Sequence, residues 1–366
     1  MDFTKKIAIV GTPCQILATT KINNYNKETG GSPIDVKIGL FCMENFSYTY
    51  LRKFLEEKEI DINEIAEFRI ENNLFKLFLN NGQEKSFTLE ETESFKRNNC
   101  EICVDFASDL SDISVGSVGS PKGYSTLIVR TEKGQNIINK AISNDYISAE
   151  KIPSDSKELA ILNKIATNKK EENLKNIKTR ENSAHPVLYK RKISNTEIAK
   201  LSNESQFDNL NKDILSEGAC VLCGACEFVC PENIIKIGQR KPNNLENKNK
   251  HCLEGCHACY YACPRTFLSE DIRPQELDSK PIGDYLDIYS AKSNITEKGQ
   301  DGGVVTSLLL YLLEEKIVDE VFIVDEDKNN PWKPVSKLTN NPELVKKSAG
   351  TKYSTIPIAF KALQND

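Results

Sequence analysis

Eight cysteines stand in two short runs whose spacing suits iron–sulfur chemistry. They are Cys220, Cys223, Cys226 and Cys230, followed by Pro231, and Cys252, Cys256, Cys259 and Cys263, followed by Pro264. In the bacterial two-cluster pattern, three thiolates of each run hold one 4Fe–4S cluster and the fourth ligates the other cluster. The predicted ligand sets are Cys220, Cys223, Cys226 and Cys263 for one cluster, and Cys252, Cys256, Cys259 and Cys230 for the other.

A pair of zinc sites is the alternative for these runs, because zinc also binds cysteines that are two residues apart. Zinc sites rarely contain three such cysteines in a row, and here two runs follow one another, so we favour clusters. One departure is that three residues separate Cys252 from Cys256, where the pattern has two. His251 and His257 lie beside cluster cysteines, and we expect them to surround the clusters rather than to bind iron.

The sequence holds 12 cysteines, so four remain: Cys14, Cys42, Cys100 and Cys103. Residues 6–10 and 36–41 are short apolar runs typical of buried strands, and each leads to a cysteine, Cys14 or Cys42. Carboxyl ends of parallel strands meet at one edge of a sheet. We therefore predict that these four cysteines hold a third 4Fe–4S cluster. Separately buried structural cysteines, or a redox dithiol at Cys100 and Cys103, are the alternatives.

Three loops have residues that suit an anionic ligand. Gly302 and Gly303 precede an apolar helical run at 304–314, where glycine permits close approach and a helix N-terminus attracts negative charge. Gly350 is followed by a hydroxyl, a cation and an aromatic ring, and the loop 117–123 contains small residues and Lys122. An ordinary turn or connection explains each loop equally well when it is taken alone.

The elements that position these residues form an expected α/β domain with a mixed sheet and a small α+β ferredoxin-like dicluster domain. We predict strands at 6–10, 36–41, 125–130, 286–291 and 317–324, a hairpin within 67–89, and helices at 48–58, 134–142, 304–314, 342–347 and 356–363. Residues 164–213 are rich in Asn, Lys, Glu and Ser, which predicts a partly helical and largely solvated linker that contains His185. The resulting divisions are 1–165, the linker 166–213, the dicluster domain 214–275 and 276–366.

Composition excludes several classes of function. The net charge is −5 and basic residues are spread among acidic ones, so we expect no nucleic-acid partner. The apolar stretch 304–313 is too short to span a bilayer, and the first residues lack the apolar region of a signal peptide, so we expect no direct membrane insertion. Many cysteines without a secretory signal favour metal or redox work in the cytoplasm.

Several of these motifs together resemble the family formed by the beta subunits of coenzyme F420 hydrogenases and dehydrogenases. They are Val-Gly-Thr-Pro-Cys-Gln at 10–15, Gly-Leu-Phe-Cys at 39–42, Cys-Glu-Ile-Cys at 100–103, Ser-Val-Gly-Ser-Val-Gly at 114–119, Asp-Gly-Gly-Val-Val-Thr at 301–306 and Gly-Thr-Lys-Tyr at 350–353. With the dicluster domain attached, the chain most closely resembles the electron-input subunit of the reduced-F420 dehydrogenase of methanogens. The amino-terminal half of deazaflavin-dependent sulfite reductases is also similar.

The resemblance implies a flavoprotein that holds FAD beside the third cluster. It places the flavin near Gly302, Gly303, Thr306, Thr351, Lys352, Tyr353, Ser117 and Gly119. The implied reaction is hydride transfer from reduced coenzyme F420 to FAD, followed by passage of single electrons through the clusters to a partner protein. Lys122 is a further candidate, for the anionic tail of F420.

The order of the segments departs from that family, because the Thr-Pro-Cys segment comes first here and last there. We interpret this as a circular permutation, in which 1–165 and 276–366 form one domain joined through the linker. A rearranged gene or a piece of a longer chain is the alternative. The location is expected to be cytoplasmic or peripheral on a membrane complex.

The predicted activity is that of an oxidoreductase of the F420H2 dehydrogenase type. A flavin converts between two-electron hydride donors and one-electron clusters, so the chemistry would take place at FAD and no side chain is assigned as catalytic. A ferredoxin-dependent reductase of an organic substrate is one alternative. The other is an electron-carrying adaptor or zinc-bound scaffold that holds no flavin.

Overall fold

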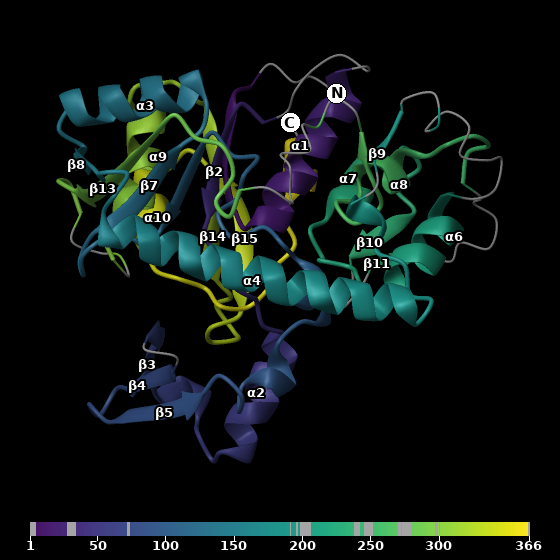
Figure 1. Cartoon of the computed structure of the whole chain (residues 1–366), viewed down its shortest axis with the longest axis horizontal. Coiled ribbons are helices and arrows are strands. Elements are labelled where there is room, and N and C mark those ends of the chain that lie inside the picture. Colours follow the sequence, from purple (N-terminus) through teal and green to yellow (C-terminus); the bar gives the residue numbers. More distant parts are fainter. Residues whose placement is uncertain are drawn as a thin grey trace.

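The computed structural model describes residues 5–27, 34–71, 74–190, 192–194, 197, 206–237, 242–244, 252–269, 272, 280–296, 299 and 301–364. A large sheet lies between helices, a small three-stranded sheet stands apart from it, and a group of short helices and strands carries the two cysteine runs (Figure 1). The long helix α4 (Lys157–Asn182) runs from the large sheet to that group. His251, most of the polar stretch 241–250 between the two cysteine runs, most of residues 271–281 and the extreme ends, 1–4 and 365–366, lie outside the described residues.

The large sheet is mixed, as the sequence predicts. Its order is β15-β14-β1-β2-β6-β7-β13-β8. The strands are β1 (Ile7–Gly11), β2 (Val36–Leu40), β6 (Ile113–Gly116), β7 (Ser125–Val129), β8 (Ile147–Lys151), β13 (Asp287–Ser293), β14 (Glu320–Glu326) and β15 (Pro334–Thr339). The neighbours β14, β1, β2 and β6 are parallel, and the other pairs are antiparallel. Strands from residues 7–151 and from residues 287–339 therefore share one sheet.

Helices cover both faces of this sheet. In β1, Ala8 packs in the cluster that includes α3 (Glu132–Ser143) and α9 (Val304–Glu314), whereas Ile7 and Ile9 pack against α1 (Pro13–Lys27). In β7, Ile128 likewise faces away from the α3 and α9 side and packs against α4. Successive side chains of a strand point to opposite faces. Because both faces are covered, β1 and β7 are buried along nearly their whole length and consist mostly of apolar residues, which made them recognisable in the sequence.

A small antiparallel sheet stands apart from the large sheet (Figure 1). Its strands are β3 (Ile65–Glu71), β4 (Leu74–Leu79) and β5 (Glu84–Thr88), and α2 (Tyr48–Glu57) packs on them through an aromatic core. The predicted hairpin is confirmed. Gly82 in the β4–β5 turn has a φ of +84°, a conformation that glycine adopts at little cost.

The cysteine runs lie in a group of short elements, which are β9 (Lys192–Ile193), α6 (Gln206–Leu210), a π-helical turn (Asn211–Leu215), α7 (Ala225–Val229), β10 (Ile235–Ile237), β11 (Pro242–Asn244), α8 (Ala258–Ala262) and β12 (Leu268–Ser269). α10 (Pro342–Lys347) completes the α-helices of the described ranges. Short 3-10 helices are Ile62–Glu64, Glu93–Phe95, Asn98–Ile102, Leu188–Lys190 and Phe360–Gln364.

Two expectations about elements are corrected. Residues 164–182 continue α4, so the partly helical character predicted for this stretch is confirmed, but the stretch is less solvated than expected, since Lys169, Lys170 and Asn173 are buried. The predicted helix at 356–363 is only the short turn Phe360–Gln364, because the segment before it contains Pro357 and bonds to other elements. There Ile356 O accepts from Gln15 Nε2 at 3.0 Å, and Ile358 N donates to Cys223 O at 3.0 Å.

Candidate functional site

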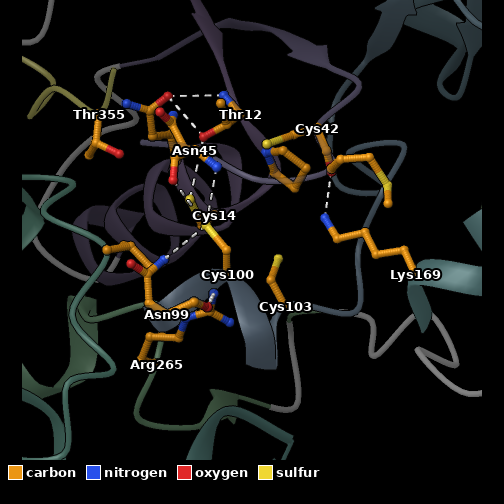
Figure 2. A pocket seen from close by; sticks show the side chains of 14 residues that line it. Thr12, Cys14, Cys42, Asn45, Asn99, Cys100, Cys103, Lys169, Arg265 and Thr355 are labelled. Carbon is orange, nitrogen blue, oxygen red and sulfur yellow. Dashed lines mark hydrogen bonds between the residues drawn. The ribbon is translucent and has the colours of Figure 1, made fainter. Parts of the chain in front are cut away.

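Cys14, Cys42, Cys100 and Cys103 line one pocket, together with Lys169 and Arg265 (Figure 2). The neighbouring parallel strands β1 and β2 end at the same edge of the sheet, and the residues that follow them include Cys14 and Cys42. Cys100 and Cys103 lie in and directly after the short helix Asn98–Ile102. The structure thus brings together the four cysteines that the sequence placed outside the two runs.

Backbone and hydroxyl groups contact two of these sulfurs. The backbone N–H of Asn45 donates to Cys100 Sγ at 3.3 Å, and Thr12 Oγ1 lies 3.3 Å from Cys14 Sγ. Thr12 is held in turn by Gln15, whose Oε1 accepts from the Thr12 N–H at 2.9 Å. Hydrogen bonds to sulfur favour its charged form, which is the form that binds metal.

Helix α4 ties the cysteine loops together through two buried side chains. Lys169 Nζ donates to the carbonyl oxygens of Cys42 and Asp105. Asn173 Nδ2 donates to Cys100 O at 2.9 Å and to Cys103 O at 2.7 Å. Ser156 begins the helix, since its side chain accepts from Leu159 N. The helix therefore fixes both cysteine loops by donating to their carbonyls.

The ionisation of the four thiols is uneven. Burial raises the pKa of Cys14 and Cys42, and it raises the pKa of Cys100 to about 11. For Cys103 burial acts in the same direction, but the cations Lys169 and Arg265 outweigh it and lower the pKa below its ordinary value. Reciprocally, burial lowers the pKa of Lys169, but the neighbouring thiolates, Cys103 above all, raise it overall. The pocket therefore places the positive side chains of Lys169 and Arg265 next to cysteine sulfurs, whose negative form they stabilise.

The donor set of this pocket is four cysteines, which is also the ligand set of a 4Fe–4S cluster. Among the residues that the structure describes, no group of three or more His, Cys, Asp or Glu side chains is arranged to hold a metal ion. Zinc draws its ligands directly around one centre, whereas a cluster places iron and sulfide between its thiolates. The Arg265 Nε is buried and has no hydrogen-bond partner, so the pocket also lacks an acceptor that a bound sulfide would supply.

Each cysteine run has a short helix that begins after its second cysteine and contains its third. These helices, α7 and α8, pack against each other. Cys223, Cys226, Cys230, Cys259 and Cys263 are buried, and Cys220, Cys252 and Cys256 are partly exposed. Gly224 has a φ of +91°, and a Cβ there would lie 2.9 Å from Ile358 O, so this position in the first run requires glycine.

Neighbouring thiolates group the eight cysteines into two sets. Burial raises the pKa of Cys226, and the thiolates that add to this effect are Cys223, Cys220 and Cys263, with Cys259 last. Burial also raises the pKa of Cys259. The thiolates that add to this effect are Cys252, Cys256 and Cys230, and Cys263 contributes least. In each set, the fourth member of one run stands with three members of the other, as the crossed two-cluster arrangement requires.

Helix α1 connects the four-cysteine pocket with the cysteine runs. Cys14 lies in its first turn, and Lys21 lies two turns further on, fully buried. Lys21 Nζ donates to the carbonyls of Cys263 and Phe267, both at 2.6 Å. Burial lowers the pKa of Lys21 to about 7, against the effect of nearby thiolates. One helix thus contacts both groups of cysteines.

The residues expected around a flavin lie in three segments: the one at Gly302, the loop 117–124 and the one at Tyr353. Gly302 and Gly303 precede α9, which also contains the buried Thr306. Gly302 N donates to Ser125 Oγ at 3.2 Å, and Ser125 follows the loop that holds the exposed Ser117, the buried Gly119 and the exposed Lys122. The described contacts bring the Gly302 segment and the 117–124 loop together at β7.

The third segment contacts the small sheet. Tyr353 OH accepts from Ile70 N at 3.3 Å, and Lys352 Nζ lies 3.5 Å from Glu326 Oε1, while Thr351 is exposed. The neighbouring Arg69 carries a charge that acts on Asp301, beside Gly302. Strand β3 thus has residues near both the Tyr353 segment and the Gly302 segment.

The glycines of this region are explained by packing. A Cβ on Gly302 would lie 2.6 Å from Ala291 O, and Gly303 begins α9 with a φ of +68°. These close contacts are with the protein's own backbone, so they fit a flavin loop without identifying one.

The two other histidines are placed in the structure. His185 Nδ1 lies 2.7 Å from Glu217 Oε2, and His257 Nδ1 lies 3.3 Å from Gly255 O. No helix in the described ranges is both long enough and apolar enough to cross a membrane.

Sequence reasoning missed Asn45, Asn99, Lys169 and Arg265, which line the pocket. It also missed Asn173, which donates to the carbonyls of Cys100 and Cys103. Arg265 stands two residues after Cys263, which was a local signal. Lys169 and Asn173 lie in a polar run whose composition hid their burial.

Comparison with known proteins identifies three regions. The family model for the C terminus of the beta subunit of coenzyme F420 hydrogenase/dehydrogenase matches residues 4–155, and the model for the N terminus of the same subunit matches residues 286–363. A 4Fe-4S binding domain matches residues 214–236, which include the first cysteine run. The part named C-terminal thus comes first in this chain.

Individual relatives match over part of their length. The coenzyme F420 hydrogenase subunit beta of Methanococcus voltae is 37% identical over 186 residues, which is 50% of this chain and 66% of that protein. An F420H2 dehydrogenase subunit of Methanosarcina mazei is 34% identical over 132 residues, 36% of this chain and 37% of that protein. The matched region therefore spans less than two thirds of these curated relatives.

One similar solved structure is a chain of the F420-reducing [NiFe] hydrogenase complex from Methanosarcina barkeri. The two chains are 32% identical, and the match covers 48% of this chain and 62% of the hydrogenase chain with a TM-score of 0.45.

Proposed function

Because this chain belongs to the family of coenzyme F420 hydrogenase/dehydrogenase beta subunits, with the two family domains in swapped order, we propose that it oxidises reduced coenzyme F420 and delivers single electrons to a partner protein. The observation that carries this proposal is the pocket of Cys14, Cys42, Cys100 and Cys103 beside the group that holds the other eight cysteines. Twelve thiols in three sets of four fit three 4Fe–4S clusters.

The overall change is balanced as follows. Reduced F420 loses two electrons and two protons, and the partner takes up the two electrons one at a time while the protons pass to solvent. When bound, FAD supplies the conversion between hydride and single electrons, and the clusters supply one-electron transfer.

The residues of this chain hold and tune those groups. The four pocket cysteines would ligate one cluster, and the sets grouped around Cys226 and Cys259 would ligate the other two. Lys169 and Arg265 place positive charge beside the first, and the Asn45 N–H donates to one of its sulfurs. Such charges and hydrogen bonds set cluster potentials. Helices α1 and α4 keep the three sets in fixed relation.

We propose the flavin at Gly302, Gly303, Thr306, Thr351, Lys352, Tyr353, Ser117 and Gly119, with Lys122 for the anionic tail of F420. The N-terminus of α9 and the side chain of Lys352 are suited to phosphate, and Tyr353 offers an aromatic ring. We also propose that 1–165 and 276–366 form one domain around the large sheet, to which β14 and β1 both belong.

Anoxic purification followed by titration tests this function. The protein should contain flavin, and stoichiometric reduced F420 should bleach the flavin and cluster absorbance. Bleaching by reduced ferredoxin but not by reduced F420 would replace the proposal with a ferredoxin-dependent reductase. Protein without flavin would be an electron-carrying adaptor, and colourless protein that contains zinc would be a scaffold.

A further inference from the structure

Arg265 belongs to the dicluster group by sequence but lies in the four-cysteine pocket. It follows Cys263 and Pro264 in the turn after α8, and it is 3% exposed. Figure 2 shows its side chain beside Asn99 and Cys103. The residue therefore joins the second cysteine run to the pocket at the edge of the large sheet.

The contacts of the guanidinium leave part of it unused. Nη2 donates to Asn99 O at 3.2 Å, and the guanidinium carbon lies 4.6 Å from the centre of the Tyr189 ring. Nε is buried without a partner. Among the described residues no carboxylate pairs with Arg265. Its side chain hydrogen-bonds to Cys103, and although burial lowers the pKa of Arg265, the neighbouring Cys103, Tyr189 and Cys14 raise it overall.

A buried guanidinium without a carboxylate needs another anion, because removing a charge from water is costly unless it is paired. The anion nearest to it is the sulfur of the pocket. A 4Fe–4S cluster held by four thiolates carries net negative charge, and its sulfides accept hydrogen bonds. An Arg donates in a fixed fork and does not lose its proton, so this charge is permanent.

Resting on the proposed function, we propose that Arg265 is supplied by the dicluster module as the potential-setting residue of the four-cysteine cluster, with its unpaired Nε–H donating to that cluster. A cation favours the more negative, reduced state of a neighbouring cluster. The cation therefore favours transfer of an electron onto the four-cysteine cluster. The pocket is then complete only when the dicluster module is docked.

Asn99 accepts hydrogen bonds from two arginines, Arg265 of the dicluster group and Arg97 beside the pocket. Its carbonyl accepts from Arg265, and its Oδ1 accepts from Arg97 Nε at 2.9 Å. Arg97 Nη2 in turn donates to Cys220 O at 2.9 Å. The two arginines thus cross the boundary in opposite directions and meet at the residue before Cys100. This contact fixes the distance between the pocket and the first cysteine run.

The test is a redox titration of the intact, cluster-loaded protein, followed by electron paramagnetic resonance with dithionite and mediators, which requires no F420. In Arg265→Gln, the reduction equilibrium of the four-cysteine cluster should shift about tenfold toward the oxidised state, equivalent to ~59 mV for one electron. Arg265→Lys keeps the charge and should retain most of the wild-type potential. The potentials of the other two clusters should move less.

Arg180→Gln is the matched control. Arg180 also has a buried Nε without a partner, but its Nη2 donates to Glu217 O at 2.6 Å and the Glu217 carboxylate lies nearby. Its substitution should leave all cluster potentials unchanged.

An unchanged potential in Arg265→Gln, or an equal shift in Arg180→Gln, would overturn the inference. If Arg265→Gln loses iron, the titration of Arg265→Lys becomes the decisive measurement. The inference requires that the four-cysteine cluster of Arg265→Lys stays near its wild-type potential. A full shift despite the retained charge would refute the potential-setting role of Arg265. Wild-type protein without a third cluster signal would instead remove the proposed function itself, before any variant is compared.

Discussion

Replacement of Asn173 by leucine tests whether α4 is part of the site. The side chain is buried and its Nδ2 donates to two carbonyls, Cys100 O at 2.9 Å and Cys103 O at 2.7 Å. Leucine is close in size but donates nothing, so Cys103 O loses this donor, whereas Cys100 O keeps the bond from Cys103 N at 3.1 Å. A buried polar group left unsatisfied costs about 1–3 kcal/mol, so the free energy of unfolding should fall by about that amount.

The assay is urea unfolding of the cluster-loaded protein under anoxic conditions, with iron measured in parallel. Loosening of the loop that carries Cys100 and Cys103 should also lower the iron content by up to a third. Asn176→Leu is the control on the same helix, since Asn176 is only partly buried and its bonds to Glu101 O and Asn173 Oδ1 are long, at 3.3 and 3.4 Å. Equal destabilisation in the two variants, or none in Asn173→Leu, would refute the reasoning.

Three further outcomes follow from the structure. Cys14→Ser should lower bound iron by about a third while the signals of the two other clusters persist, as measured by iron assay and electron paramagnetic resonance; uniform loss of all signals would contradict separate sets. Gly302→Ala would place a methyl group 2.6 Å from Ala291 O and 2.8 Å from Ser125 N, so flavin per chain should fall, and unaltered flavin content would count against this loop. Burial, and then Asp105, raise the pKa of Asp109 to about 7, above about 3.9 for a free side chain. The folded state thus binds the proton more tightly, so stability should decrease as pH rises from about 4 to about 7. Asp109→Asn should flatten that dependence in unfolding measured at about pH 5 and about pH 8, and an unchanged slope would show that Asp109 is not its source.

Much of the sheet could be predicted because its strands are buried on both faces. The apolar runs that became β1 and β2 were recognisable, and the rule that parallel strands end at one edge brought Cys14 and Cys42 together. Short-range sequence patterns were therefore enough to predict that the four cysteines share one pocket.

Helix α4 was not predictable in the same way. Its buried polar residues, such as Lys169 and Asn173, are stabilised by carbonyls more than 60 residues away in the chain, and no local pattern reports such partners. Composition alone therefore indicated solvent. Arg265 was similarly hidden, because its role depends on how the dicluster group docks against Asn99.

The most direct measurement is the number of iron atoms in the protein purified and reconstituted without oxygen, with Mössbauer spectra to identify the cluster type. The account predicts about twelve iron atoms per chain, all in 4Fe–4S clusters. About eight would mean that the pocket of Cys14, Cys42, Cys100 and Cys103 holds no cluster, and the proposed electron path would then be wrong.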